Sequence, residues 1–466
     1  MAASPSPESR GQWGSSFGFI MAAAGSAVGL GNIWRFPYIT GENGGGAFVF
    51  VYILCVILIG LPLLYNELAL GRLTGKNPIG AMKATAKNKL WVIPGIISVV
   101  ICFMVLTYYS VIAGWTVGYI ITELINIPVD FDVFIETPRY IIPLTFFFMI
   151  ITIVVILGGV SGGIEKAAKF LMPVLFFLIL AIAIRSVTLD GAMAGVEYYL
   201  KPDFAKINGK VILAALGQAF FSMSVGWGLM ITYGSYLPKT ANIVTSGMWI
   251  GAMDTIVALL GGLMVFPAVF ALGMEPNSGP ALVFDVLPQV FNAIPGGAII
   301  GALFFLLLMV AALTSTISML EVPVGYFIDE KKVNRKKAAW LVGIAAMVIS
   351  IPSIMSSVDD SFFSTITMKI GSIEKTGWFD IMDWIFGTLG VTVLCFLLAV
   401  YSGWSFNTKT LVNEISLGAP GFNKGIIGSL TPGHIWIFFI RFVCPIVIGL
   451  VLLDLFGVFG AAAGGG

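Results

Sequence analysis

Residues 25–37 read GSAVGLGNIWRFP and lie within a long apolar segment, residues 15–38. Glycine is a poor helix former, so Gly25, Gly29 and Gly31 weaken any helix that this segment forms. A second apolar segment, 211–237, contains SMSVGWG at residues 222–228, so both segments carry Val-Gly-x-Gly near their centres. The glycines either allow close helix packing, or let the backbone unwind and face protein, water or a ligand. Interruptions in matching positions of two halves favour unwinding and predict a binding site between them.

The chain as a whole is too apolar for a soluble fold. Of its 466 residues, 58% are hydrophobic and 11% are charged, whereas soluble domains carry roughly 25% charged residues. This composition predicts an all-α polytopic membrane protein. We expect about 11 transmembrane helices, near residues 15–38, 46–71, 91–124, 139–158, 167–188, 211–237, 244–273, 297–328, 338–356, 381–404 and 434–457.

The basic residues indicate an orientation. If the N-terminus is cytoplasmic, the inner segments hold 16 of the 25 Lys and Arg residues, and the outer loop 274–296 holds none. The positive-inside rule therefore favours a cytoplasmic N-terminus and, with an odd number of spans, an outer C-terminus. Residues 461–466 are expected to be a flexible tail.

The two interrupted segments stand five spans apart, which indicates an internal repeat. We expect a single transmembrane domain with one five-helix half at about 13–190, a second at about 210–405, and an extra helix at about 434–457. The four cysteines and the one histidine, His434, form no metal or redox pattern. The sequence also contains no Ser/His/Asp, Cys/His or phosphate-binding arrangement, so we do not expect an enzyme.

Several motifs together resemble the neurotransmitter:sodium symporter family, whose bacterial members have the LeuT fold. The resemblance starts with residues 25–37 and with ENGGGAF at 42–48. It continues through Pro62–Arg72 with Glu67, Tyr108–Tyr109 with Trp115, GQAFFS at 217–222 through Ser235–Tyr236, and LTST at 313–316.

The resemblance implies a fold and a function. The fold would be a 5+5 inverted repeat with broken helices 1 and 6, spanning the cell membrane several times. The function would be sodium-coupled symport of an amino acid by alternating access. The rival interpretations are a channel and a membrane amino-acid sensor that binds without transport. Many members of the family have twelve spans, whereas eleven are predicted here. The absence of the last span would affect the C-terminus and any dimer contact rather than the core.

The break at residues 28–31 suits a carboxylate, because it leaves amide groups at the start of the outer half of the helix. Gly29 stands where monoamine carriers of the family have an Asp, which favours an amino acid over an amine. Trp227 and Met319 would leave room for a small or medium apolar side chain. The resemblance implies a substrate site made of Ala27, Leu30, Gly31, Val105, Tyr109, Phe221, Ser222, Ser224, Trp227, Ser315 and Met319.

Sodium requires hard oxygen ligands, and helix breaks free backbone carbonyls for this purpose. The resemblance implies two sodium ions. One site would comprise Ala27, Asn32, Ser222, Asp254 and the substrate carboxylate, and the other Gly25, Val28, Ala311, Thr314 and Ser315. Without the motif, the hydroxyls of Thr314 and Ser315 would simply bond back to their own helix.

Chloride is not expected as a co-ion. Chloride-dependent relatives bind the anion with residues that correspond here to Tyr52, Gln218, Ser222 and Ala258, and alanine cannot donate a hydrogen bond. Asp254 stands where many members have Asn, and its fixed negative charge would balance sodium instead. A proton is the alternative counter-ion once sodium leaves, so proton antiport is part of this hypothesis.

Ionisable residues at the segment ends resemble the gates of the family. Arg35 and Asp383 would close the outer side, and Arg10 and Asp329 would close the inner side with Trp13 and Tyr236 beside them. Gly163 and Pro173 resemble a Gly-x9-Pro element at the start of the fifth span. Because Pro removes an amide and Gly tolerates unusual dihedral angles, this stretch could unwind and admit water.

Overall fold

The computed structural model describes residues 11–125, 127, 129–273, 283–284, 287–292, 296–370, 373–425 and 429–458. Arg10, the proposed tail 461–466 and most of the outer loop 274–296 lie outside these residues. All eleven predicted segments contain helices. Within the described residues, nine helical stretches are long and apolar enough to span a membrane, and one bent pair adds a tenth.

The stretches that could span a membrane contain several π-helical turns, which carry η labels. The helices and turns of these stretches have the following bounds. They are α3 (Gly46–Cys55), η3 (Val56–Gly60) and α4 (Leu61–Thr74); η4 (Lys89–Val92) and α6 (Ile93–Leu124); α8 (Pro138–Leu157); η5 (Val160–Glu165) and α9 (Lys166–Val187); α13 (Ile243–Ala271); α15 (Gly297–Lys331); α16 (Arg335–Met355); α18 (Trp378–Met382), η8 (Asp383–Gly390), α19 (Val391–Val400) and η9 (Tyr401–Ser405); and α21 (Pro432–Phe438), η11 (Phe439–Val443) and α22 (Cys444–Leu455), with η4 alone being a 3-10 turn.

Shorter elements connect these spans. They are α5 (Pro78–Thr85), α7 (Phe131–Ile135), α10 (Met193–Leu200), η6 (Phe204–Lys206), α14 (Leu287–Asn292), α17 (Phe362–Thr365), β1 (Thr367–Ile370), β2 (Ile373–Thr376), α20 (Thr408–Ser416) and η10 (Pro420–Asn423). The two strands form an antiparallel hairpin in which Thr367 faces Thr376 and Ile370 faces Ile373. The sequence did not predict this hairpin.

The first predicted span is broken where its glycines lie. Helix α1 (Ser16–Ala27) ends at Val28, whose backbone is extended. The chain resumes in η2 (Gly31–Arg35) and α2 (Phe36–Glu42), and the two halves are bent by 50°. The predicted sixth span is likewise two short helices, α11 (Gly209–Ser222) and α12 (Leu229–Gly234). Both interruptions are therefore unwound backbone rather than close-packed helix.

The second break depends on left-handed backbone. Gly226 and Gly228 have φ angles of 77° and 74°, which glycine adopts without steric cost. Ser224 has a φ angle of 51°, which is unusual for a residue with a side chain. Its hydroxyl donates to the carbonyl of Ser26 over 2.8 Å, so the second break is tied directly to the end of α1.

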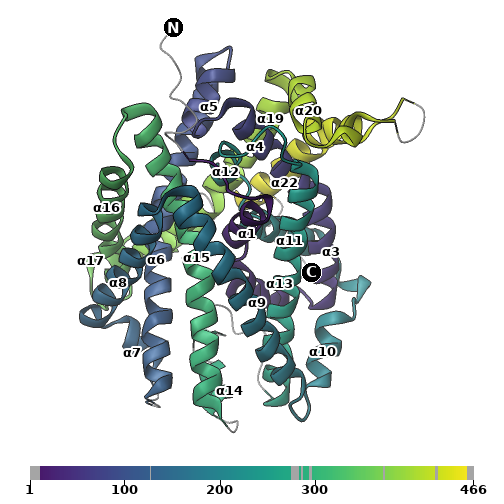
Figure 1. Ribbon diagram of the computed structural model, residues 1–466. Helices are drawn as coiled ribbons and strands as arrows, with labels where there is room; N and C mark the ends of the chain where they lie inside the picture. The colour runs from purple at the N-terminus through teal and green to yellow at the C-terminus, as the bar shows by residue number, and fades with distance from the viewer. Residues whose placement is uncertain are drawn as a thin grey trace.

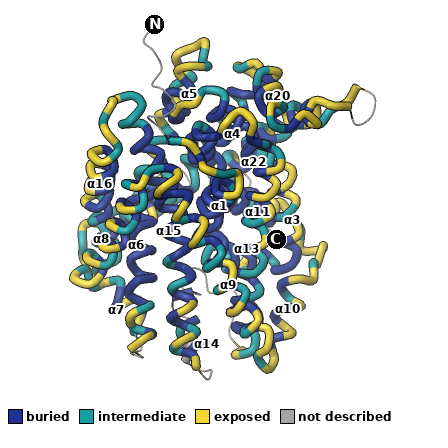
Figure 2. Tube along the Cα trace, in the orientation of Figure 1, coloured by how far each residue is buried: buried dark blue, intermediate teal, exposed yellow. Residues whose placement is uncertain are grey.

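Helix α15 forms the centre of the molecule and packs along α6, α9, α16 and α1. Figure 2 shows buried residues along α15 and around α1, with exposed residues on the outer helices. In Figure 1, α5 and α20 lie at the end of the molecule where the N-terminus is marked, whereas α7, α10 and α14 lie at the opposite end. The basic segments around α5 and α20 therefore share one end, as the predicted topology requires.

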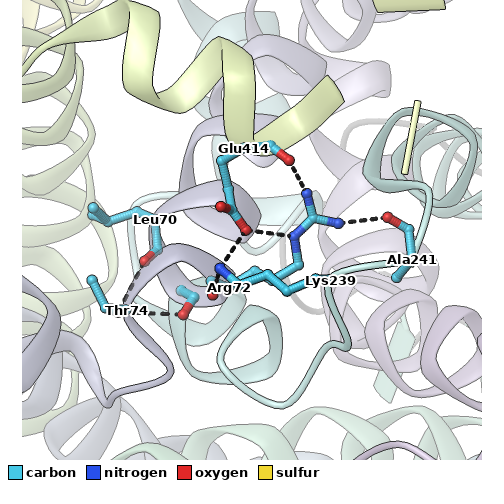
Figure 3. Close-up of polar contacts among 7 residues, drawn as sticks. Leu70, Arg72, Thr74, Lys239, Ala241 and Glu414 are labelled. Carbon is cyan, nitrogen blue, oxygen red and sulfur yellow. Dashed lines mark hydrogen bonds and ion pairs between the residues drawn. The ribbon is translucent and has the colours of Figure 1, made fainter. Parts of the chain in front are cut away.

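A buried ionic cluster fixes α20 to this end (Figure 3). Arg72, at the end of α4, donates from Nε to the Oε1 of Glu414 over 2.9 Å and from Nη1 to the carbonyl of Ala241 over 2.5 Å. Its Nη2 donates to the carbonyl of Glu414. Lys239 donates to the same Glu414 Oε1 over 2.8 Å. The Arg72 side chain is 0% exposed and that of Glu414 is 5% exposed, so one carboxylate of α20 holds α4 and the loop after α12 together.

Replacing Glu414 tests this cluster. Glu414→Gln leaves the buried guanidinium of Arg72 without its counter-ion, and we expect it to cost about 3 kcal/mol of folding free energy. Thermal unfolding of the purified protein measures the loss. Glu330→Gln is the matched control, because its ion pair with Lys83 is partly exposed and should contribute less than about 1 kcal/mol. Equal losses in the two variants would show that the cluster does not stabilise the fold.

Candidate functional site

The first break places an amide beside a tyrosine hydroxyl. The backbone N–H of Leu30 donates to the Oη of Tyr109 over 3.0 Å, and Tyr109 is almost fully buried. A Cβ atom on Gly29 would lie 2.9 Å from the same hydroxyl, so a side chain at position 29 would crowd it. The amide of Leu30 and the hydroxyl of Tyr109 therefore form a small polar surface suited to a carboxylate.

A cavity of about 350 Å³ opens above this surface. Leu30, Gly31, Tyr109 and Phe221 line its inner part, as predicted for the substrate site. The other predicted substrate residues do not line it and lie buried in the core; they are Ala27, Val105, Ser222, Ser224, Trp227, Ser315 and Met319. The ring of Phe221 packs against that of Trp227 with centroids 5.7 Å apart, so Phe221 separates the cavity from Trp227.

Arg35 and Asp383, the predicted outer gate, both line this cavity. No ion pair joins them, although both belong to the described part of the chain. Instead Arg35 donates from Nη1 to the Oε1 of Gln218 over 2.9 Å, and its guanidinium lies 4.8 Å from the ring centre of Phe221. The cavity therefore reaches Phe221 without a closed ion pair above it.

Three of the residues predicted for the first sodium site, Asn32, Ser222 and Asp254, meet around the Asp254 carboxylate. Asn32 donates from Nδ2 to the Oδ1 of Asp254 over 2.7 Å, and Ser222 donates to both carboxylate oxygens over 2.9 Å. Tyr52 donates to Oδ2 over 3.1 Å. Asp254 is fully buried, and none of the ion pairs among the described residues involves it. Because a buried charge is costly without a partner, this cluster suits a cation.

The same contacts bear on chloride. Tyr52 and Ser222, two of the residues that correspond to the anion site of relatives, donate to Asp254 instead. Gln218 donates from Nε2 to the carbonyl of Gly31 over 2.8 Å and accepts from Arg35. Ala258 is buried and its side chain has no donor. The hydroxyls of Tyr52 and Ser222 are thus directed at a fixed carboxylate.

The predicted second sodium site lies between α1 and α15. Thr314 donates from Oγ1 to the carbonyl of Ala311 over 2.9 Å and, more weakly, to that of Val28 over 3.4 Å. Ser315 also bonds back to Ala311, over 3.3 Å. A Cβ atom on Gly25 would lie 3.2 Å from the Cβ of Thr314. All five predicted residues therefore meet, and the hydroxyls bond to their own helix while facing the break.

Residues that precede α1 pack against the end of the sixth span, where the inner gate is predicted. Trp13 donates from Nε1 to the carbonyl of Tyr233 over 3.0 Å, and its ring packs edge-on against Tyr233 and Tyr236. Tyr236 donates to the Oε1 of Glu321 over 2.7 Å. Glu321 in turn forms a two-point ion pair with Arg335, with N–O distances of 2.7 and 2.9 Å. These contacts thus connect the end of α12 to α15 and α16.

The predicted Arg10–Asp329 latch is only half described, because Arg10 lies outside the described residues. Asp329 accepts from the backbone N–H and the side-chain Nδ2 of Asn77 over 3.0 and 2.8 Å. The sequence did not single out Glu321 and Arg335. Glu321 lies in a predicted span, and an ionisable residue at such a position is a signal that could have identified it.

Glu165 is a third residue that the sequence did not single out. It accepts from the N–H of Gly14 over 2.6 Å and from the hydroxyl of Ser15 over 2.8 Å, and it pairs with Lys169. Glu165 ends the π-helical turn η5, which contains Gly163. The predicted unwinding element is therefore in direct contact with the segment that precedes α1.

Comparison with known proteins identifies the family. A family model described as the sodium:neurotransmitter symporter family matches residues 10–130 and 135–459. The chain belongs to this family. The symporter is 39% identical to an uncharacterized sodium-dependent transporter of Bacillus subtilis, YhdH, over 96% of this chain and 98% of the relative. It is 34% identical to an uncharacterized sodium-dependent transporter of Haemophilus influenzae, over 96% of this chain and 98% of the relative.

A solved structure of MhsT in complex with L-phenylalanine matches the symporter with a TM-score of 0.85 and 39% identity. The match covers 96% of this chain and 100% of that chain. The comparison confirms the predicted LeuT fold, and the family confirms a sodium-dependent transporter rather than an enzyme.

Pro173 provides a test of the unwinding element. Proline inside α9 denies the carbonyl of Lys169 its helical partner, so Pro173→Ala should restore that bond and make the helix harder to unwind. We expect turnover of the symporter to slow several-fold while substrate binding from the outer side is retained. Sodium efflux and uptake rates measure the effect. Pro143→Ala, the matched change inside α8, should leave turnover unchanged. If Pro173→Ala turns over at the native rate, both Gly163 and Pro173 have only a packing role.

Proposed function

We propose that this symporter takes up an apolar amino acid together with sodium by alternating access. One observation carries the proposal: the amide of Leu30 contacts the hydroxyl of Tyr109 at a helix break, and Asn32, two residues after Leu30, contacts the buried Asp254. A carboxylate bound at the break would thus lie close to a cation bound at Asp254. A zwitterionic amino acid satisfies this arrangement, with its ammonium facing the carbonyls freed at the second break.

The predicted side-chain pocket behind Phe221 supports a small or medium apolar side chain. Trp227 and Met319 are bulky and buried, and Phe221 covers Trp227 from the cavity side. Gly29 leaves no carboxylate of the protein's own at the break, so the substrate has to supply one. MhsT, which shares 39% of its sequence with this chain, binds L-phenylalanine, and this supports an amino-acid substrate.

Two sodium ions would occupy the Asn32–Asp254 cluster and the Thr314 site. Because the substrate carboxylate would be a ligand of the first ion, substrate and sodium would each tighten the binding of the other. The outer cavity and the packing of residues 11–15 at the predicted inner gate support access from one side at a time, which favours a carrier over a channel. We also propose that the N-terminus faces the cytoplasm and that the protein lies in the cell membrane.

Uptake into proteoliposomes tests the proposal. With radiolabelled L-alanine, L-leucine and L-phenylalanine, we expect an inward sodium gradient to drive accumulation of at least one of them above its external concentration. The matched control ligand is phenethylamine, which lacks the carboxylate of phenylalanine and should not be accumulated. Equilibration without accumulation would indicate a channel. Sodium-dependent binding without uptake would indicate a sensor.

We further propose that transport is independent of chloride and that Asp254 returns protonated when sodium has left. The carboxylate of Asp254 occupies the hydrogen bonds of Tyr52 and Ser222 that an anion would need. When the cation leaves, a proton is the counter-ion that requires no further space in a fully buried site. The net reaction would then exchange a proton for sodium and substrate, and uptake would depend on pH.

Replacing Asp254 tests this exchange. In the native protein, uptake should be unchanged when gluconate replaces chloride. Asp254→Asn keeps the size of the side chain but removes its charge, so we expect it to lose uptake, to respond to chloride, or to lose the pH dependence. Asp380→Asn, which changes an acid at the outer cavity, is the control and should keep native behaviour. Strong chloride dependence of the native protein together with normal Asp254→Asn uptake would contradict the proposal.

A further inference from the structure

Arg441 lies in the last span, Pro432–Leu455, and belongs to the π-helical turn η11. Its Nε donates to the carbonyl of Gly403 over 2.7 Å, and its guanidinium lies 5.6 Å from the ring centre of Trp404. Trp404 in turn donates from Nε1 to the carbonyl of Arg441 over 2.8 Å. Two residues of neighbouring spans therefore hold each other in a fixed arrangement.

The two spans approach closely at this point. A Cβ atom on Gly403 would lie 2.9 Å from the Cα of Arg441, so only glycine permits the contact. Both spans are π-helical there, in η9 and η11. Such turns in helices are rare and often occur at functional sites. The side chain of Arg441 is partly exposed beside this contact.

Gly403, which contacts Arg441, lies near one end of its own span. It lies two residues before the end of its span, which is Trp378–Ser405. Tryptophan is enriched at the level of the lipid headgroups, where the polar end of its ring meets water. Trp404 directly follows Gly403 and is 62% exposed, which suits a tryptophan at the headgroup level. The positive charge of Arg441 therefore lies beside the end of the Trp378–Ser405 span, next to an exposed tryptophan.

The charge of Arg441 has no carboxylate partner among the described residues. None of the ion pairs there involves it, and only its Nε is hydrogen-bonded to the protein. The surface around it is aromatic and exposed: Phe438 is 54% exposed and Phe442 41%. The ring of Phe442 packs edge-on against Trp404 with centroids 5.5 Å apart. The free Nη groups of Arg441 thus lie at the edge of an apolar surface.

We propose that this site binds the phosphate of an anionic phospholipid. The free Nη groups of Arg441 would bind the phosphate oxygens, because guanidinium donors match that geometry. An acyl chain of the same lipid would lie along Phe438 and Phe442. A lipid with a net negative charge neutralises the arginine, whereas the ammonium of a zwitterionic lipid competes with it for the phosphate. A second copy of the chain would bring the same cation and the same apolar face, and so does not supply the missing charge.

Native mass spectrometry of the purified protein tests the site, with phosphatidylglycerol and phosphatidylcholine of identical acyl chains as probes. We expect the native protein to retain one phosphatidylglycerol more firmly than any phosphatidylcholine. Loss of a charged hydrogen bond should weaken this binding about tenfold in Arg441→Gln. Arg441→Lys keeps the charge but loses the fork and should fall between the two. Trp404→Leu should weaken binding by removing the ring beside the guanidinium.

Arg139→Gln is the matched control, because Arg139 also lies over an aromatic ring, 4.8 Å from the centre of Tyr140, but on another span. It should leave the firmly retained lipid unchanged. Sodium-dependent substrate binding, measured on every variant, verifies folding, and the lysine variant remains informative if Arg441→Gln does not fold. The proposal is overturned by equal retention in Arg441→Gln and the native protein, by equal retention of the two lipids, or by equal losses in Arg139→Gln. It is also overturned if soluble glycerol phosphate displaces the lipid, or if Arg441→Gln abolishes a dimer instead.

Discussion

An unwound backbone inside a membrane has to find partners for its amides and carbonyls, and this constraint organises the molecule. The two breaks satisfy it largely through each other and through residues around them. The hydroxyl of Ser224 donates to the carbonyl of Ser26, and the amide of Leu30 donates to Tyr109. The amide of Gly226 donates to the buried carboxylate of Glu67 over 2.5 Å. A substrate and its ions would bind between two breaks that hydrogen bonds already connect. Their binding would therefore depend on the positions of both broken helices at once.

Both helix breaks could be predicted from the sequence, because each depends on the local chemistry of its glycines. Glycines at 29, 31, 226 and 228 mark them directly, and apolar runs of sufficient length located every predicted span. Asn32, Ser222 and Asp254 were expected to meet through the family resemblance, and their side chains do so. The resemblance also implied that Arg35 and Asp383 form a gate, and the structure brings both to one cavity without pairing them. Their pairing stays a prediction because it depends on the conformational state, which the sequence does not encode.

What the sequence could not predict are contacts between distant charges. Arg72 and Glu414 are separated by 342 positions; Arg72 ends an apolar run, whereas Glu414 lies in a largely polar stretch between two predicted spans. Glu165 is followed four residues later by Lys169, a pattern of a solvated helix face, yet its carboxylate also caps the segment at Gly14 and Ser15. These partners are decided by how the spans pack. The hairpin β1–β2 was missed for a related reason, since its strands are short and lie between long helices.

The segment that packs at the predicted inner gate, residues 11–15, precedes the first helix and is not itself helical. Trp13 reaches Tyr233, while Gly14 and Ser15 reach Glu165. Releasing such a segment restores backbone entropy of roughly 1–2 kcal/mol per residue, which offsets much of the enthalpy of the lost contacts. If transport opens this end of the molecule by releasing the segment, the opening would gain chain entropy, so warming would favour it. Such a step would be more sensitive to temperature than the movement of a rigid helix.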